Sequence, residues 1–289
     1  MIAKARLQAA QPDGAVAAGA EAKATARFRI SDGRIHQIRY RRSASSDRSV
    51  FAVGVAKGGS TLLHGILTDL EAYSSRKLLP IGRNFFSQGV PLNTVVEDVD
   101  NLFRQNGYIF GTFRWLPQRL HIPALKTYKT VLLVRDPRDM LVSAYYSFRE
   151  SHPIPNVEGI KGRMERRRER LRETSLDDYV RSAADGVKYK YFHTMTLLSS
   201  RGLLLRRYED IIFDKERFVG DIAEFFEIPA SGADIAAVAK KHDIVPGTED
   251  PKQHIRQVKP RNFESKLAPA TVEEISHKLR AILCEFGYN

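Results

Sequence analysis

Cysteine is nearly absent from this sequence, which has 289 residues and a single cysteine, Cys284. One cysteine forms no internal disulfide and no multi-cysteine metal site. Long apolar runs are also absent, because none approaches the roughly 18 to 20 consecutive apolar residues that a membrane-spanning helix requires. The alanine-rich N-terminus lacks a compact apolar segment followed by a cleavage site, so it is a poor secretory signal. We therefore expect a soluble, cytoplasmic protein without a transmembrane segment.

Acidic residues are too few to balance the basic ones. The chain has 34 Asp and Glu against 46 Lys and Arg, which gives a formal net charge of +12. Such an excess favours an anionic ligand or acceptor. Much of it lies in two clusters, residues 34–48 and 161–172. Because no zinc-finger, RNP-type or basic-zipper pattern is present, we expect no nucleic-acid partner.

The chain is long enough for one large α/β domain, and 43% of its residues are hydrophobic. Residues 1–48 form a basic, alanine-rich N-terminal extension that we expect to be partly disordered, with one edge strand around residues 28–30. The folded domain is expected over residues 49–289. Within it, residues 159–173 are nearly all charged, which predicts a solvated helix or a lid.

Four short apolar segments predict buried strands: residues 50–55, 108–113, 129–134 and 202–208. Helical stretches follow them, beginning near residues 61 and 140. Apolar strands that alternate with helices indicate a three-layer α/β fold with a central, mainly parallel sheet. Ligands of such sheets bind at the carboxyl ends of the strands, where this sequence places Lys57, Arg114, Arg135 and Tyr208.

The first strand runs into the loop GVAKGGST, which begins at Gly54. A Walker A loop has the pattern G-x-x-x-x-G-K-[ST], but here the position of its lysine holds a serine. Glycine-rich turns before a helix N-terminus bind anions through their backbone N–H groups. We expect an anion site made by one lysine, two glycines and two hydroxyl residues: Lys57, Gly58, Gly59, Ser60 and Thr61.

The third strand runs into a second motif, VRDPRDMLVSAYYSF. Arg135 stands at the end of the strand, where its guanidinium is suited to bind a phosphate with two hydrogen bonds. Ser143 follows eight residues later, about two helical turns away, and adds a hydroxyl. Without the first motif, this segment could be no more than a charged turn with a local salt bridge.

These motifs resemble those of the sulfotransferases that use 3′-phosphoadenosine 5′-phosphosulfate (PAPS). In that family a K-x-G-[ST]-T loop holds the 5′-phosphosulfate and an R-[DN]-P-[RK]-D-x-x-V-S-x-Y-Y segment holds the 3′-phosphate. Tyr208-Glu209-Asp210 resembles the family's Y-E-D element beside the adenine, and residues 254–263 resemble its C-terminal segment, with Arg256 matching an arginine that closes on the 3′-phosphate. The resemblance implies a P-loop-like fold and sulfuryl transfer to a hydroxyl or amine, with 3′-phosphoadenosine 5′-phosphate (PAP) as product and no metal.

This chemistry suits the displaced lysine. Sulfuryl transfer places negative charge on the oxygen between sulfur and the 5′-phosphate, and Lys57 is expected to stabilise it. An ATP-dependent kinase is the alternative enzyme, but it needs the missing Walker lysine and magnesium. A second alternative is a catalytically silent module that binds PAP or a polyanion.

The general base departs from the family pattern. Cytosolic members carry a K-T-H-L-P segment whose histidine is the base, whereas this sequence has Gly111 in place of the lysine and Phe113 at or near the histidine. Because phenylalanine accepts no proton, the candidates are His152, His64 and Glu150. Arg114 keeps its proton and is expected to contact an anion instead. The sequence does not identify the acceptor, for which a saccharide or a lipid head group is the hypothesis, and it leaves the oligomeric state open.

Overall fold

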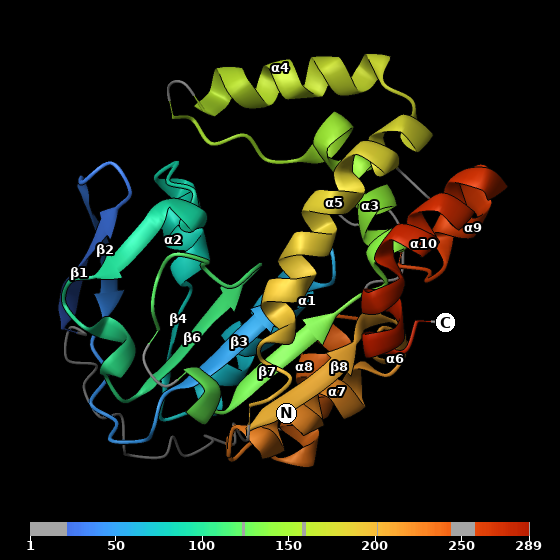
Figure 1. The fold of residues 1–289 in the computed structure, drawn as a ribbon. Helices are drawn as coiled ribbons and strands as arrows, with labels where there is room; N and C mark the ends of the chain where they lie inside the picture. Colours follow the sequence, from blue (N-terminus) through green and yellow to red (C-terminus); the bar gives the residue numbers. More distant parts are fainter. Residues whose placement is uncertain (1–21, 123–124, 158–159, 201, 244–257, 289) are drawn as a thin grey trace, which may run out of the picture.

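Five strands pair in parallel to form the central sheet of the protein in a computed structural model (Figure 1). Their order across the sheet is β4 (Lys77–Leu79), β6 (Tyr108–Phe113), β3 (Val50–Gly54), β7 (Thr130–Val134) and β8 (Leu203–Arg207). The four strands expected from sequence are confirmed, and β4 is added at one edge. The residues that the structure describes are 22–122, 125–157, 160–200, 202–243 and 258–288.

Helices cover both faces of this sheet. Their bounds are α1 (Ser60–Leu70), α2 (Ile81–Ser87), α3 (Pro137–Tyr146), α4 (Ile160–Glu173), α5 (Leu176–Met195), α6 (Tyr208–Ile211), α7 (Lys215–Phe225), α8 (Gly232–Lys241), α9 (Asn262–Lys266) and α10 (Pro269–Phe286). Four short 3-10 helices are Glu71–Tyr73, Leu92–Thr94, Leu102–Arg104 and Leu125–Thr127, and a π-helix, η5, spans Ser147–Ser151.

Side chains that alternate along the strands build a separate apolar core on each face. On β3, Val50 and Ala52 pack with α1, α7 and α8, whereas Phe51 and Val53 pack with α3, α5 and α10. All five residues of β3 are buried, as are all five of β7. Helix, sheet and helix therefore make the three layers of the expected α/β fold.

A second, antiparallel sheet is formed by β1 (Lys23–Ile30), β2 (Ile35–Arg41) and β5 (Val95–Asp98). The sequence predicted one strand around residues 28–30, and the structure instead has a hairpin across residues 23–41. Its inward side chains Ala26, Phe28 and Ile30 are buried, and Phe28 meets Phe85 edge to face with 5.1 Å between ring centroids. The buried side chains of β1 anchor the hairpin to the rest of the protein. Residues 1–21 of the predicted extension lie outside the described residues.

The charged segment expected near residue 160 is the helix α4, which lies across one end of the molecule, away from the central sheet (Figure 1). Leu171 is its one buried residue. In the described part of the chain, every helix is too short or too polar to cross a membrane.

Candidate active site

A cavity of about 920 Å³ opens at the carboxyl ends of the central strands. The residues that follow β3, β6, β7 and β8 all contribute to its lining. The predicted site residues that line it are Lys57, Gly59, Ser60, Thr61, His64, Arg114, Arg135, Ser143, His152 and Tyr208. Gly58 is buried within the loop, and Arg256 lies outside the described residues.

The loop between β3 and α1 owes its shape to two residues with positive φ. Lys57 has φ 65° and Gly59 has φ 91°. The Gly58 N–H donates to the Val55 carbonyl at 2.8 Å, and a Cβ on Gly58 would lie 2.4 Å from Val55 Cγ2. Only glycine therefore fits at position 58 without a shift of the loop.

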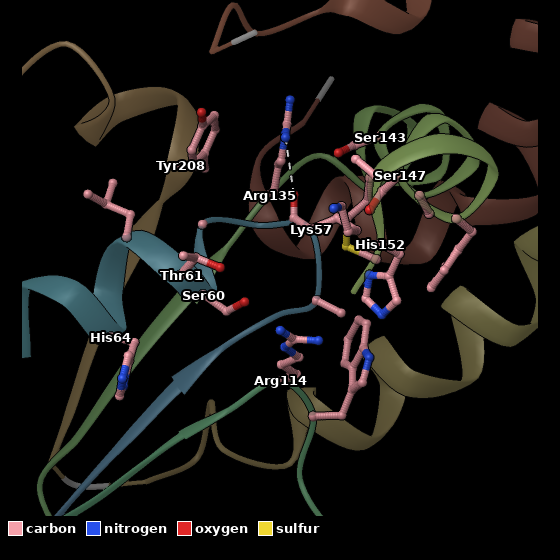
Figure 2. A pocket seen from close by; sticks show the side chains of 18 of the residues that line it. Lys57, Ser60, Thr61, His64, Arg114, Arg135, Ser143, Ser147, His152 and Tyr208 are labelled. Carbon is pink, nitrogen blue, oxygen red and sulfur yellow. Dashed lines mark hydrogen bonds between the residues drawn. The ribbon is translucent and has the colours of Figure 1, made fainter. Parts of the chain in front are cut away.

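Helix α1 begins directly after this loop, at Ser60. Its N-cap, Gly59, supplies no side-chain cap to the first N–H groups of the helix. Unpaired N–H groups at a helix N-terminus carry partial positive charge and attract anions. The loop, Lys57 and the hydroxyls of Ser60 and Thr61 surround one end of the cavity in Figure 2.

Arg135 leaves the end of β7 and reaches this loop. Its Nη1 donates to the Lys57 carbonyl oxygen at 3.1 Å (Figure 2), and its guanidinium carbon lies 4.5 Å from the centroid of the Tyr208 ring. The side chain is only 8% exposed, and its buried Nε has no hydrogen-bond partner among the described residues. A buried guanidinium with an unpaired donor at a cavity is suited to an anionic ligand.

Asp139 joins Arg135 to the C-terminal segment of the chain. Its carboxylate lies 3.5 Å from Arg135 Nη2 and accepts the backbone N–H groups of Arg261 and Phe263 at 2.8 and 2.9 Å. Burial raises the pKa of this carboxyl, while Arg135 opposes that rise. Arg261 and Phe263, at the end of the segment predicted to close on the 3′-phosphate, are thus held close to Arg135, whereas Arg256 lies outside the described residues.

An apolar wall adjoins the arginine. Tyr208 is 6% exposed and packs with Leu62, Ile212 and Val258. Its hydroxyl donates to the Val258 carbonyl at 3.4 Å. This wall presents a flat, mostly apolar surface to the cavity, which suits a planar base.

Two serines face the cavity from α3 and its continuation. Ser143 was predicted, and Ser147 lies one turn later, where the helix changes to π geometry (Figure 2). The sequence analysis missed Ser147 because the family's pattern ends at Tyr146, one residue before it. A single inserted residue of this kind re-aims the side chains that follow, and π-turns frequently occur at functional sites.

Phe113, placed by the sequence analysis at the position of the base, lies in the core instead. It is fully buried and stacks on Phe51, with 6.2 Å between centroids. The next two residues, Arg114 and Trp115, line the cavity. The strand end therefore brings a guanidinium and an indole to the site.

The two candidate histidines differ in environment. His152 follows the π-helix, and its ring packs edge to face with Phe148 and Phe86, at 4.8 and 6.2 Å between centroids. His64 lies on α1, where burial, together with Arg83, lowers the pKa of its imidazole to about 4. Its buried Nδ1 has no hydrogen-bond partner among the described residues.

The third candidate, Glu150, is paired with Arg149 at 3.1 Å and is not among the described residues that line the cavity. Several lining residues are not among those that the sequence analysis assigned to the site. They are Arg83, Phe86, Trp115, Ser147, Arg167 and Lys190. For Arg83, Arg167 and Lys190, the excess of positive charge in the sequence was the only signal.

Comparisons with known proteins agree with this geometry. A family model described as a sulfotransferase domain matches residues 47–245. The fold is similar to mouse sulfotransferase SULT7A1 complexed with PAP, at 14% identity, a TM-score of 0.56, and coverage of 85% of this chain and 90% of that one. Retinol dehydratase in complex with androsterone and inactive cofactor PAP has 16% identity, a TM-score of 0.53, and coverage of 81% and 80%.

No match was found among curated proteins. The structural likenesses, at such low identity, establish the P-loop-like α/β fold. The family model covers more than half of the sequence and includes the loop after β3, the arginine after β7, Ser143 of α3 and Ser147 of the π-helix. The chain therefore belongs to the sulfotransferase-domain family.

Proposed function

We propose that this protein transfers the sulfuryl group of PAPS to a hydroxyl or amine of its acceptor and releases PAP. The observation that carries the proposal is the meeting of Lys57, the N-terminus of α1 and buried Arg135 in one cavity, with Arg135 Nη1 bonded to the Lys57 carbonyl. The PAP in the neighbouring structures supports this choice of nucleotide.

The donor's two anionic groups each have a partner in this arrangement. The N–H groups and hydroxyls of Gly58, Gly59, Ser60 and Thr61 would bind the 5′-phosphosulfate. Arg135 and Ser143 would bind the 3′-phosphate, joined by Arg256 from the C-terminal segment. Tyr208 would lie against the adenosine, in keeping with the apolar wall of Leu62, Ile212 and Val258.

In the reaction, the acceptor oxygen forms a bond to sulfur while the bond from sulfur to the bridging oxygen breaks. The electron pair of that bond stays on the 5′-phosphate of PAP, and Lys57 would stabilise the resulting charge. The acceptor proton passes to a base.

We propose His152 as that base. A base with a pKa near the working pH is the most effective, and the pKa of His64, lowered to about 4, makes it a weak acceptor. In Figure 2, the ring of His152 points toward the open space shared by Lys57 and Arg114, and His64 points away from it. Glu150 is already paired with Arg149.

A labelled-donor assay tests the function. The protein is incubated with ³⁵S-labelled PAPS and a panel of glycans, lipids and phenols, and PAP binding is measured separately by thermal shift. Lys57→Ala should keep PAP binding and reduce transfer by about 100-fold or more, because a charge contact made in the transition state is lost. Lys240→Ala, an exposed lysine of α8 that does not line the cavity, is the control.

Near-normal transfer by Lys57→Ala would contradict the role of this lysine. Stabilisation by PAP without transfer to any member of the panel would instead favour the silent PAP-binding module. Magnesium-dependent turnover of ATP would favour the kinase.

A further inference from the structure

Beyond the loop after β3, the cavity lining includes Lys215 and Lys241, which are paired with Asp243 and Asp69, and four further cationic side chains from four different elements. They are Arg83 of α2, Arg114 at the end of β6, Arg167 of α4 and Lys190 of α5. We call the part of the cavity that these four residues bound the acceptor chamber. They are distinct from Lys57 and Arg135, which the proposed function assigns to the donor.

Three of the four cations lie over aromatic rings that also line the cavity. The Arg114 guanidinium is 5.8 Å from the centroid of Phe86, the Arg167 guanidinium is 3.8 Å from that of Phe148, and Lys190 Nζ is 5.4 Å from that of Trp115. Such rings hold the long side chains in place at modest energetic gain and leave their polar N–H groups directed to the cavity.

Carboxylates that would neutralise these cations are missing from the described lining. Asp69 is the only acidic residue among the described residues that line the cavity. It already accepts hydrogen bonds from Lys241 at 2.6 Å and from His242, with 2.7 Å to Nε2. None of the ion pairs among the described residues includes Arg83, Arg114, Arg167 or Lys190.

The positive charges also act on one another. Burial lowers the pKa of Arg114, and Arg83 lowers it further. Burial likewise lowers the pKa of Lys190, with a further contribution from Arg167. Like charges held close together repel one another, so a bound anion would relieve the repulsion.

Helix α4 adds positive charge at the surface next to the chamber. Arg168 of α4 donates to the His152 carbonyl at 2.8 Å, which fastens the helix at the edge of the chamber and places Arg167 in its wall. The exposed face of α4 carries further basic residues at Lys161, Arg163, Arg166, Arg170 and Arg172. A surface with this excess raises the local concentration of anions at the entrance.

We propose that the acceptor is itself an anion, which carries a carboxylate, phosphate or sulfate beside the hydroxyl that it presents, and that Arg83, Arg114, Arg167 and Lys190 bind this group. The proposal rests on the function proposed above and names its substrate class. The rings of Phe86, Trp115 and Phe148 would contact the uncharged part of the acceptor.

Trp115 provides the test, because it is the only tryptophan of the chain and lies in the chamber wall. The protein, saturated with PAP so that the donor site is filled, is titrated with glucose, glucuronate, glucose 6-phosphate and glucose 6-sulfate while tryptophan fluorescence is recorded. We expect a saturable change with at least one anionic sugar and none with glucose. The order of the three affinities then identifies the preferred anionic group.

Variants separate the chamber from general surface charge. Arg114→Ala and Lys190→Ala should each weaken binding of that sugar by roughly tenfold, since each removes a charge-assisted contact. Arg172→Ala removes the same charge from an exposed position of α4 outside the lining, where it acts only through the screened surface field, and should weaken binding far less. An equal loss in Arg172→Ala would overturn the proposal.

Equal responses to glucose and the anionic sugars, or no response to any of them, would also overturn it. The saturation step keeps the two proposals distinguishable. Failure of PAP to stabilise the protein would contradict the donor site, whereas PAP binding without preference for anionic sugars contradicts the acceptor chamber alone. If Arg114 serves the donor instead, Arg114→Ala will raise the KM for PAPS equally with charged and neutral acceptors.

Discussion

Individual histidines in this cavity have different chemical capacities because their neighbours differ. His64 is half-buried close to Arg83, and both the burial and the nearby charge disfavour its protonated form. His152 lies among aromatic rings at the end of a π-helix, where its backbone N–H donates to the Ser147 carbonyl at 2.7 Å. Of these two histidines in one cavity, we therefore expect only His152 to be catalytic.

At this scale we predict that His152→Ala lowers kcat by about 100-fold or more, because a positioned general base contributes on this order. His64→Ala should change kcat only a few-fold. Both variants should keep PAP binding, measured by thermal shift, and exposed His277→Ala of α10 serves as the control. The reverse ranking of the two variants would assign the proton transfer to His64.

Among the elements, α3 connects two parts of the proposed donor site, Arg135 and the C-terminal segment. It begins two residues after Arg135 and carries Asp139 in its first turn. It then continues into the π-helix that leads to His152. Through Asp139, it also holds the backbone of Arg261 and Phe263. A substitution in the first turn of α3 should therefore affect the C-terminal segment as well as the proposed phosphate site.

At the scale of elements we predict that Asp139→Asn destabilises the protein by about 1–3 kcal/mol, because an amide cannot accept both backbone N–H groups as the carboxylate does. Its affinity for PAP should fall roughly tenfold, since the Arg135 guanidinium loses its anchor. Urea denaturation and PAP titration measure the two effects. Asp185→Asn, which alters an exposed ion pair with Lys278, should have neither effect.

A loss of stability in Asp139→Asn with unchanged PAP affinity would contradict the coupling. It would show that the C-terminal segment is held near Arg135 without contributing to the nucleotide site.

For the whole molecule, the N-terminal hairpin supports the acceptor side of the cavity. Phe28 packs against Phe85 of α2, and Gln88, just after that helix, donates to the Gln37 carbonyl of β2 at 2.9 Å. Helix α2 in turn carries Arg83 and Phe86 to the cavity. The basic N-terminal region is thus joined to the site through packing.

We predict that Phe28→Ala lowers the free energy of unfolding by about 3–5 kcal/mol, the usual effect of deleting a buried aromatic ring. It should also weaken anion binding in the chamber, reported by Trp115 fluorescence, more than PAP binding. Thr25→Ala, on the exposed face of the same strand, is the matched control. If Phe28→Ala and Thr25→Ala weaken anion binding equally, packing of the hairpin does not support the acceptor chamber, and the prediction is wrong.

The proposed donor site was accessible to sequence analysis because its residues belong to local motifs. A short strand, a glycine-rich turn and a helix N-terminus occupy one stretch of chain, so residues 57–61 indicate an anion site by themselves. Arg135 and Ser143 belong to a second local stretch. The parallel sheet then places the ends of both stretches at one edge, as the alternation of strands and helices predicts.

What only the tertiary structure decided is which distant side chains meet. It placed Phe113 in the core and Arg114 in the cavity, and it lowered the pKa of His64 through burial and Arg83. It also brought Arg83, Arg167 and Lys190, more than 100 residues apart at the extremes, around one chamber. The residues of the proposed donor site lie in short stretches of sequence, because the backbone of a loop and a helix N-terminus forms most of it. The residues of the proposed acceptor chamber are far apart in sequence, and only packing between elements brings them together.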